Sequence, residues 1–139
     1  SGKGSITGLY TVLVEGDDIS EPISDAVRAI LYGHIVLSRE MAAHNHYPAI
    51  DILNSVSRLM IDVITKEHQQ FSMRFKDFMA TYKTAEDLIN IGAYTKGSNP
   101  KIDIAIQKYD MMVQYLRQGI HESIDWRHSL DELKRIMEV

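Results

Sequence analysis

Two side chains near the middle of the chain could present chemically useful groups at a surface. Tyr47 offers an aromatic ring face, and Pro48 favours an extended conformation for the residue before it. Arg58, eleven positions later, offers a planar cation that matches the geometry of phosphate. The polar run Asn54–Ser57 leads into that arginine. The alternative is that Tyr47 belongs to a core and Arg58 is simply solvated.

Other chemical motifs are missing from the sequence. There is no G-x-x-x-x-G-K-[ST] phosphate loop, and Gly2-Lys3-Gly4 has the wrong spacing for one. His44-Asn45-His46 has no carboxylate or thiolate at ligand spacing, so we expect no metal site. There is also no G-x-S-x-G elbow, and the chain contains no cysteine. We therefore expect no complete hydrolytic site within these residues.

Length and charge narrow the possible functions. A chain of 139 residues allows one domain, or pieces of two small ones. Its 15 basic and 19 acidic residues give a net charge of −4, which argues against a nucleic-acid surface. We find neither a membrane-spanning apolar run nor a signal peptide, and the cytoplasm is the expected location.

The first sixty residues predict alternating strands and helices. Residues 6–14 are apolar on both faces, as in a central strand of a parallel sheet. A helix is expected over 23–32, a second buried strand over 34–38 and a short helix over 39–44. Because a central strand needs neighbours, we expect the sequence to be truncated at its N-terminus.

From Thr65 onward the sequence predicts helices. A long helix, a helix capped by Asn99 and Pro100 and ending at Gly119, and a last helix from about Ser123 or Asp125 follow one another. The residues expected to face the core are Phe71, Phe75, Phe78, Tyr82, Ala85, Ile89 and Gly92, then Ile102, Ile106, Tyr109, Val113 and Leu116, then Trp126, Leu130, Leu133 and Met137. The expected fold class is α/β followed by all-α.

Several segments carry a resemblance to one family. They are Gly4–Thr7, Thr11–Asp18, Glu21–Ile23, Gly33–Glu40, Tyr47–Asp51, Ser55–Arg58, Asp87–Tyr94 and Leu116–Gly119. Together they resemble the export ATPases of bacterial flagella and type III secretion systems, which are relatives of the rotary ATP synthase subunits. The resemblance implies the last portion of a RecA-like P-loop NTPase domain over 1–60 and a C-terminal helical domain over 61–139. It also implies a C-terminal fragment that lacks the Walker A and B motifs and is inactive alone.

The resemblance assigns roles to individual residues. The position matching Tyr47 stacks on the adenine of ATP in its own subunit, and the position matching Arg58 is an arginine finger to the neighbouring subunit. Gln118 and Gly119 match the place where the helical domain closes over adenine, although no Phe matches the second aromatic wall of the synthase catalytic subunits.

The resemblance also implies a setting. The parent would be a homohexamer that uses ATP and Mg²⁺, both of which need the missing N-terminal part. Its partners would be export chaperones and stalk-like and stator-like components. It would lie in the cytoplasm, peripheral to an export gate at the inner membrane. The acidic loop 17–22 and the turn 95–100 would face a stalk in the central hole; the alternative is that both are solvated turns.

Two other functions stay open. The chain could be a non-enzymatic helical docking module for export chaperones or a central stalk protein. It could also belong to a catalytic subunit of a rotary synthase, but Asn54–Ser57 and Asn90–Tyr94 favour an export enzyme.

Overall fold

The computed structural model describes residues 2–14 and 22–138. The chain divides into two compact units, Ser1–Tyr32 and Gly33–Val139. This division lies between residues 32 and 33 and does not test the domain boundary predicted near residue 60, which stays a prediction.

The first unit differs from the sequence prediction in one respect. Residues 2–14 are extended but form no strand, so the central strand predicted over 6–14 is wrong for the described residues. A strand needs a partner for its backbone hydrogen bonds, and the described part of this unit supplies none. The predicted helix is confirmed as α1 (Pro22–Ile30), whereas the acidic residues 17–21 lie outside the described residues.

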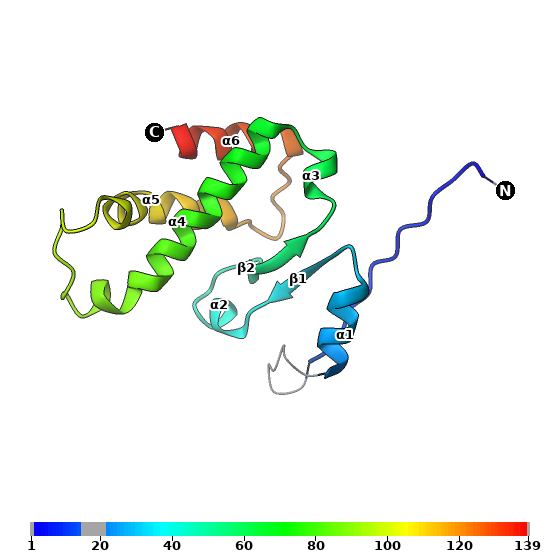
Figure 1. The fold of residues 1–139 in the computed structure, drawn as a ribbon, viewed down its shortest axis with the longest axis horizontal. Helices are drawn as coiled ribbons and strands as arrows, with labels where there is room; N and C mark the ends of the chain where they lie inside the picture. The colour runs from blue at the N-terminus through cyan, green and yellow to red at the C-terminus, as the bar shows by residue number, and fades with distance from the viewer. Residues whose placement is uncertain (1, 15–21, 139) are drawn as a thin grey trace. The chain divides into compact units, whose positions relative to one another are not determined.

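The second unit begins with an antiparallel strand pair. The strands are β1 (Gly33–Leu37) and β2 (Ile50–Ser57), and the short helix α2 (Arg39–Ala43) lies between them in the sequence (Figure 1). The hydroxyl of Ser38 accepts a hydrogen bond from the Met41 N–H and so caps α2. The predicted strand at 34–38 and the helix after it are confirmed, but this strand is half exposed rather than buried. β2 was not predicted.

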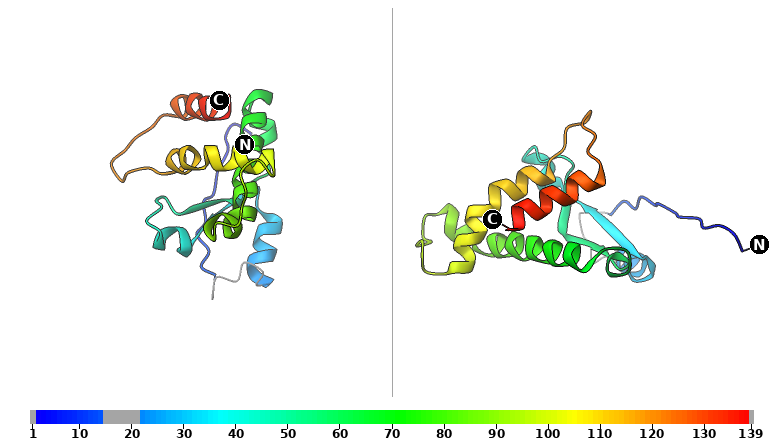
Figure 2. Two further views of the ribbon diagram at one scale, coloured as in Figure 1. Left: turned by 90° about the vertical axis from the view of Figure 1, so that its left-hand side faces the viewer. Right: turned by 90° about the horizontal axis from the view of Figure 1, so that it is seen from above.

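Four helices follow β2: α3 (Met60–Val63), α4 (Lys66–Asn90), α5 (Pro100–Leu116) and α6 (Trp126–Glu138). Side-chain caps explain where the long ones begin. The Thr65 hydroxyl accepts the His68 N–H, the Asn99 amide oxygen accepts the Lys101 N–H, and Asp125 accepts the N–H groups of Arg127 and His128. Figure 2 shows α4, α5 and α6 lying together, and residues of each pair of these helices are in contact.

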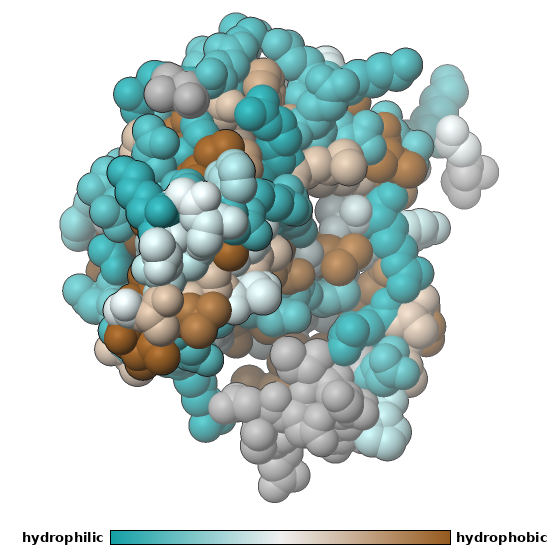
Figure 3. Space-filling view, turned by 60° about the vertical axis from the view of Figure 1, so that its left-hand side comes forward, coloured by the Kyte–Doolittle hydropathy of each residue, from teal (hydrophilic) through white to brown (hydrophobic). Residues whose placement is uncertain are grey.

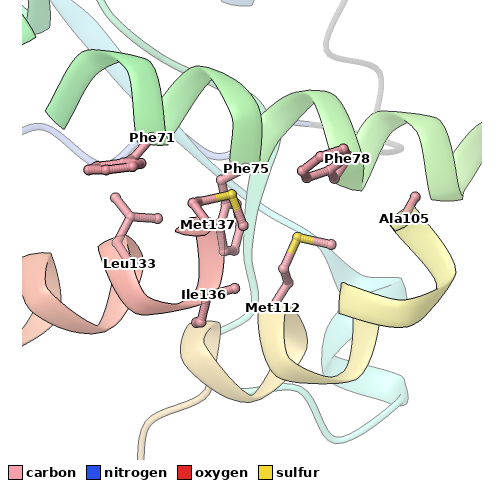
Figure 4. Close-up of a cluster of buried hydrophobic side chains, with 8 residues drawn as sticks. All are labelled: Phe71, Phe75, Phe78, Ala105, Met112, Leu133, Ile136 and Met137. Atoms are coloured by element: carbon pink, nitrogen blue, oxygen red, sulfur yellow. The ribbon is translucent and has the colours of Figure 1, made fainter. Parts of the chain in front are cut away.

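One hydrophobic cluster joins these three helices. Figure 4 shows phenylalanines of α4 directed toward side chains of α5 and α6. The buried members are Phe71, Phe75, Phe78, Ala105, Met112, Leu133, Ile136 and Met137. The predicted faces of α4 and α6 are therefore largely confirmed, except that Trp126 is exposed and Gly92 lies beyond α4 with a φ of 69°.

The predicted face of α5 is displaced around the helix. The five residues expected to point inward are only half buried, whereas Ala105, Lys108 and Met112 are buried. Lys108 is the polar member of this face, and its ammonium group donates a hydrogen bond to the backbone carbonyl of Ile136 at the end of α6. Burial lowers the pKa of Lys108, and the nearby charge of Arg74 lowers it further. A residue that counts as polar in a sequence pattern therefore lies inside.

The face in Figure 3 is mostly hydrophilic and carries separate apolar patches. Among the described residues, no helix is both long and apolar enough to cross a bilayer.

Candidate functional site

A hollow of about 520 Å³ lies between the loop before β2 and the loop after α5. It is open to solvent, because every residue that lines it is exposed. The lining residues are Asn45, Tyr47, Arg117, Gln118, Gly119, Ile120 and Glu122. The volume falls in the range of small-molecule sites.

Three of the predicted site residues meet at this hollow. The backbone N–H of Gln118 donates a hydrogen bond of 2.9 Å to the carbonyl oxygen of Tyr47. Gly119 follows directly and lines the same hollow. Tyr47 is 53% exposed, so it does not belong to the core. Residues far apart in sequence thus come together, while their roles toward a nucleotide stay predictions.

The loop that carries Tyr47 is held at both sides. Before it, the N–H of His46 donates to the carbonyl of Met41 at 2.9 Å, and Asn45 adopts a positive φ of 55°. After it, the N–H of Ser38 donates to the carbonyl of Ala49 at 2.9 Å, which extends the strand pair. Backbone bonds therefore fix the position from which the ring projects.

His46 is the buried part of this loop. Its side chain is 6% exposed, and its Nε2 atom has no hydrogen-bond partner in the described part of the chain. Burial lowers the pKa of His46, and the guanidinium of Arg117 lowers it further. Both effects disfavour the charged form of this buried imidazole.

The loop after α5 contains a closely bonded turn. The N–H of Glu122 donates to the Gly119 carbonyl at 3.0 Å, and the N–H of Gly119 donates to the Glu122 carboxylate at 2.8 Å. The Gln118 side-chain amide donates to the Glu122 carbonyl at 3.0 Å. Ile120 stands at the tip of this turn and is 96% exposed.

Arg58 lies away from the hollow. In the strand pair, Leu37 is paired with Ile50 and Gly33 with Ser57, so the two ends of β2 lie at opposite ends of β1. At about 3.3 Å per residue, those ends are roughly 13 Å apart. Tyr47 precedes one end and Arg58 follows the other, and Arg58 is exposed. The structure therefore does not bring this cation to the tyrosine ring.

Asp51 organises the irregular stretch between the two ends. Residues 52–55 of β2 lie opposite the single residue Ile35 of β1, which makes an irregular bulge of four residues against one. The Asp51 carboxylate accepts the N–H groups of Leu53 and Asn54 at 3.0 and 3.1 Å, and the Asn54 amide at 2.7 Å. The Ser55 hydroxyl donates to the Asp51 carbonyl and accepts the Val36 N–H. The Asp51 carboxylate therefore stabilises the backbone conformation of the bulge.

Sequence reasoning missed most of the lining. Asn45, Arg117, Ile120 and Glu122 were not predicted as site residues, and neither was the buried His46. A signal was present at Gly119, where a glycine after a helix marks a turn. Nothing in the pattern showed which other loop that turn would meet.

The described residues fit a nucleotide only in part. A half-exposed aromatic ring and an exposed isoleucine suit a flat base in a hollow of this size. Mg²⁺ prefers carboxylate oxygens, and no group of three His, Asp or Glu among the described residues could hold an ion. Within residues 2–14 and 22–138, the hollow therefore has an aromatic and an aliphatic side chain on its lining, and no cluster of metal-ligating groups is found.

Family models and similar proteins match nearly the whole length of this chain. A family model described as the T3SS EscN ATPase C-terminal domain matches residues 64–135. A second, the nucleotide-binding domain of the ATP synthase alpha/beta family, matches residues 1–57. The flagellum-specific ATP synthase of Salmonella typhimurium is 50% identical over 97% of this chain. The type 3 secretion system ATPase of Pseudomonas savastanoi pv. phaseolicola is 44% identical over 98%. The chain spans 30% of the length of each of these two relatives.

Solved structures give the same picture. The assembled ATPase EscN of the enteropathogenic E. coli type III secretion system superposes with a TM-score of 0.92 at 44% identity, over 96% of this chain and 32% of that one. EscN in complex with its central stalk EscO superposes with a TM-score of 0.87 at 42% identity. That match covers 99% of this chain and 32% of the EscN chain. The ATP synthase subunit NeqB superposes with a TM-score of 0.77 over 90% of this chain and 32% of its own. At 23% identity, this match shows a shared fold alone.

Proposed function

Since this chain belongs to the family of flagellar and type III secretion ATPases, we propose that it supplies two separate parts of a shared ATP site. The first is a wall for adenine, formed around Tyr47. The second is an arginine finger, Arg58, that reaches ATP held by a neighbouring subunit. The first part of the chain is then the end of a RecA-like P-loop domain.

One observation carries this proposal. The backbone bond from Gln118 to Tyr47 places a half-exposed aromatic ring and the loop after α5 on one open hollow. A solvent-exposed ring on a loop whose backbone is held by hydrogen bonds is suited to stacking on a flat base. Gln118 and Gly119 then close the same pocket from the helical side.

The position of Arg58 supports a second, separate role. It follows the end of β2 that lies away from the hollow, so Tyr47 and Arg58 stand at opposite ends of the strand pair. In an assembly of identical subunits, one strand can thereby serve its own ATP with one end and a neighbour's ATP with the other. A guanidinium placed against the transferring phosphoryl group is worth about 10³–10⁵ in rate.

The whole enzyme supplies the rest. Mg²⁺ and the β- and γ-phosphates need a Walker lysine and hydroxyl that this sequence does not contain, so this chain alone is inactive. We propose a hexamer in the cytoplasm, peripheral to the inner membrane, that hydrolyses ATP to drive protein export. Export chaperones and stator-like components are its further partners.

A stalk contact is supported by a relative and by one local feature. EscN has been solved with its central stalk EscO. In this chain Leu88 and Ile91, at the end of α4, are exposed apolar residues that precede the turn at 95–100 in the sequence. The same feature favours the second candidate function, a docking module that binds a stalk protein or chaperone without hydrolysing ATP.

The test compares full-length enzymes that carry this segment. Arg58→Ala should lower kcat by about 10³-fold or more while the Kd for ATP stays within about twofold. Arg127→Ala, which removes an exposed arginine of α6, is the matched control. Activity of the wild type should rise with protein concentration as subunits assemble.

A mixing experiment identifies the subunit on which the arginine acts. Arg58→Ala subunits mixed with subunits lacking the Walker lysine should regain activity, because a hybrid interface has both groups intact. ATP binding that falls in parallel with kcat would place Arg58 in its own site. Activity indifferent to the substitution would favour the docking module.

A further inference from the structure

A lysine of α4 is bonded to the backbone of β2. The ammonium group of Lys76 donates a hydrogen bond of 3.0 Å to the carbonyl oxygen of Ser55. Three residues before Ser55, Ile52 packs against the hydrophobic cluster formed by α4, α5 and α6. The irregular stretch of β2 is therefore attached to the helices at two points, in addition to its pairing with β1.

Ser55 is the residue at which several of these attachments meet. Its hydroxyl donates to the Asp51 carbonyl and accepts the N–H of Val36 on β1, while its own carbonyl accepts the ammonium of Lys76. Arg58 follows three residues later, which is about 10 Å of strand at roughly 3.3 Å per residue. The backbone that leads into the arginine is therefore held to both β1 and α4.

The chain after the arginine returns to the same helix. Leu59 has helical backbone angles and leads directly into α3, which contacts α4. The side-chain cap of Thr65 then begins α4 itself. Arg58 thus lies between two attachments to α4, the bond from Lys76 before it and α3 after it. A movement of α4 relative to β1 would displace the backbone that carries the arginine.

The bond from Lys76 contributes little to stability, because Lys76 is exposed and water competes for both partners. What the bond fixes is the distance between one turn of α4 and one peptide group of β2. Its loss should therefore alter the placement of the strand end and leave the folded state intact.

We propose that Lys76 is a positioning residue for Arg58, whose bond to Ser55 holds the end of β2 where the arginine reaches the neighbouring subunit's ATP. This inference rests on the proposed function, and it gives a residue of the helical part a role in turnover. A guanidinium assists phosphoryl transfer only within reach of the transferring group, and a misplacement of about 1 Å can cost about 10²-fold in rate.

The experiment measures ATP hydrolysis by the full-length enzyme. Lys76→Met removes the donor and keeps an unbranched side chain, and it should lower kcat about tenfold with the KM for ATP within about twofold. Lys76→Arg keeps a cationic donor and should stay within about threefold of the wild type. The Tm of both variants should lie within about 2 °C of the wild type, because the bond is exposed.

Lys66→Met is the matched control, because it replaces an exposed lysine of the same helix. It should leave kcat and KM as in the wild type. Wild-type kinetics for Lys76→Met, with Arg58→Ala still lowering kcat, would overturn this inference alone. Wild-type kinetics for Arg58→Ala would overturn the arginine finger itself.

A double substitution tests whether Lys76 acts through Arg58. In an Arg58→Ala background, Lys76→Met should lower kcat no further, because no guanidinium is left to position. A second tenfold fall in that background would show that Lys76 acts by another route and would overturn the inference.

Mixed assemblies identify the subunit whose ATP is affected. Lys76→Met subunits mixed with subunits lacking the Walker lysine should gain activity above the sum of the two alone, as expected for Arg58→Ala subunits. The reason is that one interface of the hybrid has an intact lysine site facing an intact arginine. No gain would place the effect of Lys76 on the ATP of its own subunit and would contradict the proposal.

Discussion

The carbonyl oxygen of Tyr47 accepts a hydrogen bond of 2.9 Å from the backbone N–H of Gln118. This bond joins the loop before β2 to the loop after α5, and the open hollow lies between them. Because both partners are main-chain atoms, side chains at either position can be replaced without removing the bond. Substitutions here therefore test side-chain roles within an unchanged frame.

Tyr47→Ala in the full-length enzyme should raise the KM for ATP by about tenfold, because loss of base stacking costs roughly 1–3 kcal/mol. The kcat should change little, since stacking acts on ground and transition states alike. Tyr47→Phe keeps the ring and should match the wild type. Steady-state kinetics provide the measurement, and an unchanged KM in Tyr47→Ala would remove this ring from the adenine pocket.

His46 should make the stability of this chain depend on pH. Because the folded state lowers the pKa of His46, its neutral form contributes stability that is present above the ordinary value of about 6.5. That stability is lost as the pH falls through the lowered pKa, where a buried imidazolium would lie near Arg117. Thermal unfolding at pH 7.5 and 5.5 should show a smaller fall in Tm for His46→Gln than for the wild type.

The matched control for that measurement is His121→Gln, which replaces an exposed histidine of the turn after α5. It should leave the pH dependence as in the wild type. Equal slopes for the wild type and His46→Gln would show that another group is responsible.

Lys108 should stabilise the helical bundle from within. Its ammonium bonds the Ile136 carbonyl, and its side chain is 5% exposed. Lys108→Ala should lower the free energy of unfolding by about 1–3 kcal/mol, because a buried carbonyl loses its partner. Denaturant unfolding measures this directly. Lys108→Met refills the space and should recover part of the loss.

Lys101→Met is the comparison for Lys108. Lys101 is exposed and pairs with Asp77 at 2.8 Å, and such surface pairs contribute about 0–1 kcal/mol. If Lys108→Ala cost no more than Lys101→Met, the buried bond would have no special weight.

The helices could be predicted because their signals are local. Asn99 before Pro100 marks a helix start, and the phenylalanines of α4 recur at helical spacing. The buried face of α5 could not be predicted, since a lysine at position 108 reads as exposed until its carbonyl partner on α6 is known. Its partner is distant in sequence.

The strands were harder for the same physical reason. The apolar run 6–14 has strand composition, yet composition supplies no pairing partner. β2 contains Asp51, Asn54 and Ser55, which favour turns, and the structure uses them to build a bulge inside a strand. Tyr47 and Arg58 were found by residue type, whereas the turn that meets Tyr47 depends on a long-range backbone bond.

The bulge around Asp51 separates two registers of one strand. In a regular strand, deleting one residue turns every following side chain to the opposite face. Here residues 52–55 are unpaired opposite Ile35. A residue can therefore be inserted or deleted among them without changing the register of the paired residues on either side. The tyrosine end and the arginine end of β2 are thereby free to vary in length independently, and insertions or deletions among the relatives are expected to concentrate within this stretch.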